Sequence, residues 1–240
     1  MSPFEDFVRK MTRREVLAMV GAAGAAVAAT RCGGSEASPI SPTTTTTTTS
    51  PTAACAVSPS ETVGPYPSLT DLIRSDIREG KSGTPLTLTI NVVNVTASCA
   101  AVSGAAVDVW QCDAEGHYSQ YSQPGFNGTS QTFLRGIQTT DSTGRVTFTT
   151  VYPGWYQGRA THIHVEVTVN GRSVKVTQIA FPESVTAAVY ATGVYAAKGQ
   201  NPTSNSGDMV FSDSVSSELA TVSGDPTSGY TATFTVGVSI

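Results

Sequence analysis

Stretches in which apolar and polar residues alternate one by one constrain the fold of this chain more than any other feature. Alternation places every second side chain on the same face of an extended strand, so that one face is apolar and the other is polar. The clearest stretches are residues 86–92, 146–149, 162–169 and 230–240. We predict a half-buried β-strand over each of them.

Turn sequences separate these predicted strands. Residues 141–144 and 225–229 are rich in the Asp, Ser, Pro and Gly residues that favour turns. An Asn-Gly pair at 170–171 lies between two Val-rich stretches and is typical of a two-residue hairpin. Helical segments are expected only in short stretches such as 68–78 and 184–197. The pattern predicts an all-β fold, an antiparallel β-sandwich with short helical turns.

Residues 1–31 resemble a bacterial export signal. Two adjacent arginines, Arg13 and Arg14, precede an apolar run over residues 16–30. That run is shorter than the roughly 20 residues of a membrane-spanning helix. The arginine pair favours the twin-arginine route, and an ordinary secretory signal is the alternative. We expect an exported protein, either periplasmic, attached to the cell envelope or secreted. Cleavage upstream and lipid attachment at Cys32 both remain open.

Residues 32–53 have the composition of a linker. An unbroken run of threonines covers residues 43–49, with Pro42 and Pro51 on either side. Such a segment buries too little apolar area to offset its ordering entropy. We therefore predict one folded domain over residues 54–240.

The charge of the chain excludes some partners. Charged residues make up only 13% of the sequence and the net charge is −4. A nucleic-acid-binding protein normally shows a basic patch, so we expect no nucleic-acid partner. We also predict no membrane-spanning helix.

Three cysteines, Cys55, Cys99 and Cys112, fall within the predicted domain. In an oxidising compartment we expect one disulfide and one remaining thiol, and the sequence does not decide the pairing. None of them has the close spacing of a cysteine-ligated zinc site.

Two of the three histidines lie close together in one predicted strand. His162 and His164 flank Ile163, so both imidazoles project from one face while Ile163 points into the core. Two neighbouring imidazoles can bind one metal ion. The alternative is a pair of polar residues on the surface of a strand.

Several ordered motifs surround this pair. They are Gly-Pro-Tyr at 64–66, Val-Asp-Val at 107–109 followed by Gly-x-Tyr at 116–118, and Pro-Gly-x-Tyr at 153–156 followed by Arg-x-x-His-x-His at 159–164. Together they resemble the intradiol ring-cleavage dioxygenases, the family that includes protocatechuate 3,4-dioxygenase and catechol 1,2-dioxygenase. The closest resemblance is to the exported, single-domain bacterial branch. It covers most of residues 55–182 and implies the β-sandwich core of that family.

The resemblance implies one non-haem Fe(III) per chain, held by two tyrosines and two histidines. The matching positions are Tyr118, Tyr156, His162 and His164. The set makes chemical sense because Fe(III) is a hard cation that suits anionic oxygen donors. A phenol with a pKa near 10 ionises at neutral pH only when a cation stabilises it.

The resemblance also implies a reaction, in which O2 cleaves a catechol between its two hydroxylated carbons to give a muconate-type diacid. Tyr156 matches a tyrosinate that the substrate displaces and that takes up a catechol proton. Arg159 matches an arginine that stabilises developing negative charge. Gln178 matches a glutamine near the same pocket, with an outward strand residue as the alternative. Tyr66 matches a pocket residue, with a simple turn as the alternative.

Four further residues are expected to have structural roles. We predict that Trp110 and Trp155 serve in packing, with substrate contact as the alternative, and that Asp108 makes a structural hydrogen bond. We expect His117 at the surface, because it points away from Tyr118 if both lie on a strand.

Two other function classes compete with the enzyme. One is a non-catalytic β-sandwich that serves as a binding module of the cell envelope. The other is a zinc hydrolase that uses the histidine pair, for which Glu166 is the nearest general base. The complete set of two tyrosines, two histidines and one arginine favours the dioxygenase. The sequence decides neither the substituent on the catechol nor the oligomeric state.

Overall fold

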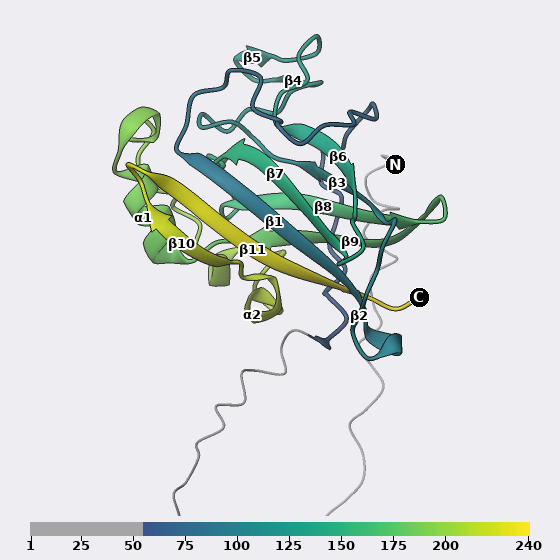
Figure 1. Ribbon diagram of the computed structural model, residues 1–240. Coiled ribbons are helices and arrows are strands. Elements are labelled where there is room, and N and C mark those ends of the chain that lie inside the picture. Colours follow the sequence, from purple (N-terminus) through teal and green to yellow (C-terminus); the bar gives the residue numbers. More distant parts are fainter. Residues whose placement is uncertain (1–54) are drawn as a thin grey trace, which may run out of the picture. The chain divides into compact units, whose positions relative to one another are not determined.

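The computed structural model describes residues 55–240, which form two main β-sheets and a short hairpin (Figure 1). The predicted export signal at 1–31 and the predicted linker at 32–53, with Cys32, lie outside the described residues. No helix within the described part is long and apolar enough to cross a membrane.

The first sheet has the strand order β10-β11-β1-β2, and β7 also pairs with β1. Its strands are β1 (Pro85–Asn94), β2 (Ala100–Ala101), β7 (Arg145–Val151), β10 (Thr221–Asp225) and β11 (Gly229–Val238). The second sheet has the order β6-β3-β8-β9. Its strands are β3 (Ala106–Trp110), β6 (Arg135–Thr139), β8 (His162–Val169) and β9 (Arg172–Ala180). The short hairpin pairs β4 (Ser122–Gln123) with β5 (Phe126–Asn127).

The alternating apolar residues of both sheets meet in one core. The inward positions of β1, β7, β8 and β11 are buried in a single cluster, which includes Leu88, Phe148, Ile163, Val165 and Ala232. Each such side chain contributes roughly 1.5–3 kcal/mol when it is fully buried. All four predicted strands are confirmed, and the prediction that Ile163 points into the core is confirmed with them.

One strand pair departs from the predicted antiparallel arrangement. β1 runs parallel to β11, with Leu86 opposite Tyr230 and Asn94 opposite Val238. The two strands lie side by side in Figure 1 as blue and yellow arrows. A parallel pair cannot be joined by a tight hairpin and needs a long connection, and here most of the domain lies between the two strands. The other strand pairs of the two sheets are antiparallel, as predicted.

The predicted hairpin at 170–171 is confirmed. It joins β8 to β9, and Asn170 and Gly171 have φ values of 51° and 73°. Positive φ at both central residues is what a type I′ turn requires, and Asn-Gly adopts it at low cost.

One of the two predicted helical stretches is wrong. Residues 68–78 form no helix but run along the edges of β6 and β7, where Ile73 bridges Ile137 and Asp76 bridges Thr149. Their backbone groups bond to strands instead of to one another, for example from the Arg74 N–H to the Ile137 carbonyl at 3.1 Å. Pairing with a sheet edge here overrides local propensity.

The other predicted helical stretch is confirmed. Residues 184–197 contain most of α1 (Glu183–Tyr190) and all of the 3-10 turn η4 (Gly193–Tyr195). The remaining helical elements are short, namely η3 (Val95–Ala97), η5 (Asn205–Gly207) and α2 (Val215–Glu218).

The predicted disulfide is confirmed, and the structure decides its pairing. Cys55 is bonded to Cys99, while Cys112 is a buried free thiol. The bond connects the start of the described chain to the loop after β1.

The outer face of the second sheet is covered by irregular segments. Before β1, the Glu61 N–H donates to the Val176 carbonyl at the free edge of β9 at 3.0 Å, and Gly64 lies against the His164 ring on the outer face. After α1, Phe211 packs with Ala160 and Ala180 in a small apolar cluster. Polar side chains on this outer face are therefore buried instead of exposed.

Candidate metal centre

The two strand histidines are buried on the outer face of β8. His162 and His164 are 2% and 1% exposed, and their Nε2 atoms lie 3.2 Å apart. Their shared face is confirmed, and the alternative of a surface pair is wrong. The segments that cover the outer face of the sheet cause this burial.

Two tyrosines from separate loops meet the histidines. Tyr118 follows β3, and Tyr156 lies in the connection between β7 and β8. The hydroxyl oxygen of Tyr118 is 3.4 Å from Nε2 of His162, and that of Tyr156 is 3.3 Å from the same atom. The structure therefore brings together all four residues that the sequence proposed as ligands. Two oxygen and two nitrogen atoms converge on one small region.

Hydrogen bonding and packing set the orientation of both imidazole rings. Nδ1 of His162 donates to the Ala160 carbonyl at 2.6 Å, which leaves the lone pair of Nε2 free. The ring of His164 stacks flat on Trp110, with centroids 5.0 Å apart and planes 3° apart. Gly64, at a φ of +72°, lies so close to His164 that a Cβ there would meet its Cε1 at 2.8 Å. Both rings are thus fixed before any ligand binds.

Burial controls the protonation of the four side chains. It lowers the pKa of His162 to about 3 and that of His164 well below its usual value, so both imidazoles are neutral. Burial raises the pKa of Tyr156 to about 12, and burial next to Tyr156 raises that of Tyr118 well above 10. Neutral imidazoles are already in the form that binds metals, whereas the phenols need a cation to ionise.

The donor set fits a hard, highly charged cation. Two phenols can supply anionic oxygens, and two imidazoles supply neutral nitrogens. The separations of 3.2–3.4 Å between donor atoms suit atoms that share one ion at roughly 2.0–2.2 Å each. Ionised phenols would offset two positive charges, which favours a trivalent ion over a divalent one.

Arg159 and Gln178 form a pair beside the four donors. Nη2 of Arg159 donates to Oε1 of Gln178 at 2.6 Å, and Nε2 of Gln178 donates to the Thr62 carbonyl at 2.9 Å. Gln178 is fully buried, so the alternative of an outward strand residue is wrong. The guanidinium thus has a fixed place next to Tyr156.

Tyr66 contributes a further ring to this region. Its centroid lies 4.9 Å from that of Tyr118, and its carbonyl accepts a hydrogen bond from Nη1 of Arg135 at 2.9 Å. The Gly-Pro-Tyr segment is therefore packed against the donors and is more than a turn.

The residues predicted to have structural roles behave largely as expected. Trp110 is buried, Trp155 is half-buried, and Ser68 donates to Asp108 at 3.3 Å. His117 differs, because its ring stacks on Phe126 with centroids 4.4 Å apart and is only partly exposed. The cause is local, since the chain around His117 forms a turn and not the strand that was assumed.

Sequence analysis missed two buried residues that support the site. Asp208 accepts a hydrogen bond from Nε of Arg159 at 2.9 Å, and Nη2 of Arg135 donates to the Ser119 carbonyl at 2.7 Å, next to Tyr118. Asp208 lies in a polar stretch without periodicity, so the sequence carries no signal for it. Arg135 stands in a Phe-Leu-Arg-Gly motif, but nothing in that motif indicates burial.

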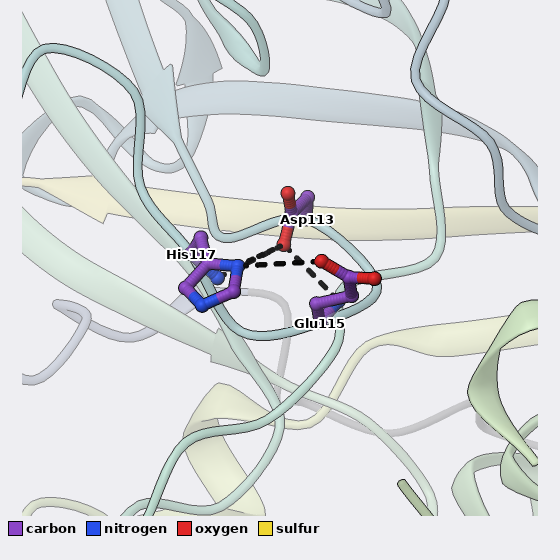
Figure 2. A group of neighbouring side chains, drawn as sticks. All are labelled: Asp113, Glu115 and His117. Atoms are coloured by element: carbon purple, nitrogen blue, oxygen red, sulfur yellow. Dashed lines mark hydrogen bonds and ion pairs between the residues drawn. The ribbon is translucent and has the colours of Figure 1, made fainter. Parts of the chain in front are cut away.

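A second cluster contains the remaining histidine. Figure 2 shows His117 facing Asp113 and Glu115, and these are the only three His, Cys, Asp or Glu residues of the described chain grouped closely enough to share an ion. However, Oδ1 of Asp113 already accepts the N–H groups of Glu115 and His117 at 3.0 and 2.9 Å. Its Oδ2 is paired with the Lys81 ammonium at 2.7 Å. These contacts explain why the three side chains lie together, because Asp113 stabilises the turn that carries Glu115 and His117.

The zinc alternative requires further ligands beside the two strand histidines. Within the described residues, no third His, Cys, Asp or Glu side chain lies close enough to His162 and His164 to share an ion with them.

Comparison with known proteins identifies what this architecture is similar to. A family model described as Dioxygenase matches residues 62–201. An intradiol ring-cleavage dioxygenase from Tetranychus urticae is 30% identical, with a TM-score of 0.70, over 77% of this chain and 95% of that one. The dioxygenase domain of a carbohydrate-binding fusion protein from Streptomyces sp. SirexAA-E is 27% identical, with a TM-score of 0.57, over 77% and 99%.

A more distant structure shares the fold. The 3-chlorocatechol 1,2-dioxygenase from Rhodococcus opacus 1CP is 21% identical, with a TM-score of 0.51, over 78% of this chain and 75% of that one. At this identity the match supports the fold alone.

Proposed function

Because this chain belongs to the intradiol ring-cleavage dioxygenase family, we propose that it binds Fe(III) and cleaves catechol-type diols with O2 to muconate-type diacids. One observation carries the proposal, namely the convergence of Tyr118, Tyr156 and His164 on Nε2 of His162. A non-catalytic binding module would need no such convergence of buried donors.

Tyr118, Tyr156, His162 and His164 would hold the iron. Two phenolates and two neutral imidazoles suit Fe(III) better than Fe(II), because the phenolates offset much of its charge. The bound iron would draw electron density from a catecholate and so make its ring reactive toward O2.

The two tyrosines differ in a way that suggests different roles. Tyr118 is completely buried, whereas Tyr156 is half-buried. The more accessible Tyr156 is therefore the one that an incoming diol would displace. Its phenolate oxygen would take up a proton from a diol hydroxyl, since burial raises the pKa of the Tyr156 phenol to about 12 and favours the protonated form.

Arg159 would stabilise negative charge that develops on the diol. Its guanidinium is held by Gln178 at one nitrogen and lies close enough to lower the pKa of Tyr156 in part. A fixed cation in a buried site stabilises charge without reorganising first. Gln178 would orient this group, and Tyr66 would form part of the pocket wall.

The predicted location is part of the proposal. We propose that residues 1–31 direct export by the twin-arginine route and that the linker at 32–53, with Cys32 as a candidate lipid site, separates the domain from the cell envelope. The disulfide between Cys55 and Cys99 supports an oxidising compartment. Detection of the uncleaved chain in the cytoplasm would contradict this part.

The visible absorption spectrum tests the function directly. We expect the iron-loaded protein to be red-brown from tyrosinate-to-Fe(III) charge transfer, and catechol added under nitrogen to shift the band to longer wavelength. Admission of O2 should then yield the ring-opened diacid. A protein that stays colourless after iron loading would overturn the site assignment and favour a binding module.

A further inference from the structure

Asp208 is a buried carboxylate beside the candidate site that neither the sequence motifs nor the family match includes. It follows η5 and lies beyond residue 201, where the family match ends. Its side chain is fully buried. An ionised carboxylate in such a place is stable only with several donors around it.

The donors to Asp208 come mainly from one dipeptide. Nε of Arg159 lies 3.1 Å from Oδ1 and 2.9 Å from Oδ2, and the Ala160 N–H donates to Oδ2 at 2.5 Å. The Val210 N–H donates to Oδ1 at 2.8 Å and closes the turn of the segment that carries Asp208. The carboxylate therefore holds both the side chain of Arg159 and the backbone of Ala160.

Each end of this dipeptide reaches a different part of the site. The guanidinium of Arg159 extends to Gln178 through Nη2 at 2.6 Å. The carbonyl of Ala160 accepts the proton on Nδ1 of His162 at 2.6 Å, which sets the direction of Nε2. Displacement of the dipeptide would thus alter the charge-stabilising group and one metal donor together.

We propose that Asp208 is a positioning residue that acts on the site through Arg159 and the Ala160 peptide. It fixes the guanidinium next to Tyr156 and keeps His162 in the orientation that points Nε2 at the other donors. The effect on catalysis rests on the proposed function, whereas the coupling between Asp208 and Arg159 does not.

The competing explanation is that Asp208 only closes the turn at Val210. Thermal unfolding of the iron-free protein separates the two, with the variants Asp208→Asn, Arg159→Gln and the double variant. Arg159→Gln leaves a buried carboxylate without its opposite charge, so we expect its Tm to fall by about 10 °C. Because Asp208→Asn removes that carboxylate charge, the double variant should unfold at a higher temperature than Arg159→Gln alone. If the decreases in Tm of the two single variants simply add in the double variant, the proposed coupling between Asp208 and Arg159 is wrong.

Asp225→Asn is the matched control. Asp225 also accepts two backbone N–H groups, from Thr227 and Ser228, but it caps the turn between β10 and β11. The decrease in Tm caused by Asp225→Asn should add to the decrease caused by Arg159→Gln. The double variant should therefore not be more stable than Arg159→Gln alone. Rescue in the control would show that the coupling is not specific to Asp208.

Kinetics and spectra of the iron-loaded protein test the positioning role. We expect Asp208→Asn to lower kcat for catechol about 10–100-fold, as is typical of residues that orient metal ligands, with little change in KM. The charge-transfer band should move, and the double variant should be no slower than Arg159→Gln. An unmoved band with unchanged kcat would overturn the proposal.

These experiments distinguish failure of the proposed function from failure of the role proposed for Asp208. A colourless wild type would overturn the proposed function but leave the unfolding cycle intact. A coloured, active wild type whose unfolding losses are additive would overturn only the role of Asp208.

Discussion

Two histidine-containing clusters, one that includes His117 and one that includes its sequence neighbour Tyr118, differ in what their polar atoms already bind. In the first, which Figure 2 shows, the carboxylate of Asp113 accepts hydrogen bonds from the backbone N–H groups of Glu115 and His117. The same carboxylate is also paired with the Lys81 ammonium. In the second, Tyr118 and the strand histidines direct their polar atoms toward one another. The comparison teaches that a candidate metal centre is better recognised by polar atoms that converge without other partners than by the presence of ligand-type residues alone.

Removal of a strand histidine should give the largest effect. We expect His164→Ala to weaken iron binding by more than the roughly 10–100-fold typical of residues that only orient a ligand, and to abolish the visible band. His117→Ala is the matched control from the other cluster and should keep both iron and colour. Iron content after dialysis and the absorption spectrum measure this. Equal loss in both variants would break the comparison.

Within the candidate centre, the half-buried tyrosine should matter most for turnover. We expect Tyr156→Phe to lower kcat about 10²–10⁴-fold, because it removes the group that takes up the diol proton. Some colour should remain, since Tyr118 is still present. Tyr121→Phe, which removes only a hydrogen bond to the Pro67 carbonyl, is the control and should retain kcat. Steady-state oxygen uptake measures both, and an active Tyr156→Phe would refute the proton role.

In the turn cluster the main effect should be on stability. Asp113→Ala leaves the N–H groups of Glu115 and His117 and the Lys81 ammonium without their acceptor. We expect the free energy of unfolding to fall by about 2–3 kcal/mol, with iron still bound by the folded fraction. Glu115→Gln, at an exposed side chain, should change stability by less than about 0.5 kcal/mol. Urea unfolding distinguishes the two, and loss of iron in Asp113→Ala would argue for a metal at this cluster.

Asp108 lies between the two clusters in how well its polar atoms are bound. Its carboxylate accepts a hydrogen bond from the Ser68 hydroxyl. Burial raises the pKa of Asp108 to about 7, so the folded state holds a proton that the unfolded chain releases near pH 4. Stability contributed by this protonated group is therefore lost as the pH rises from about 4 to about 7 and above. We expect Asp108→Asn to raise the Tm at pH 8 by a few degrees and leave it unchanged near pH 4.

Asp141, in an exposed turn, is the control because its pKa is shifted in the opposite direction from that of Asp108. Hydrogen bonds from Thr143 and from the backbone of the turn lower the pKa of Asp141, so Asp141→Asn should lower the Tm at pH 8. A rise of the Tm at both positions would contradict the explanation by burial.

Much of the fold could be predicted because its signal is local. Alternation over 162–169 shows the strand, and the Asn-Gly pair at 170–171 shows its turn. The parallel pairing of β1 with β11 has no such signal, since it depends on two strands far apart in the sequence. Residues 68–78 were misassigned because their backbone partners lie in β6 and β7.

The candidate site also combines residues that have a local sequence signal with residues that have none. The four donors lie in short motifs and could be found from sequence, whereas Asp208 is 49 residues beyond Arg159 in a stretch with no pattern. The burial of His162 and His164 was also missed. It is caused by irregular segments that cover the outer face of the sheet, and such segments follow no periodicity.

The central position of β11 sets a condition on how the domain is made. β11 lies between β10 and β1, so the first sheet stays incomplete until residues 229–238 have been made, even though β2 and β7 can pair with β1 earlier. At about 5–20 residues per second, the nascent chain exposes the unpaired edge of β1 for several seconds after that strand emerges. Long-range strand pairing is slow in itself, so the edge of β1 becomes protected from aggregation and proteolysis only after β11 has been made.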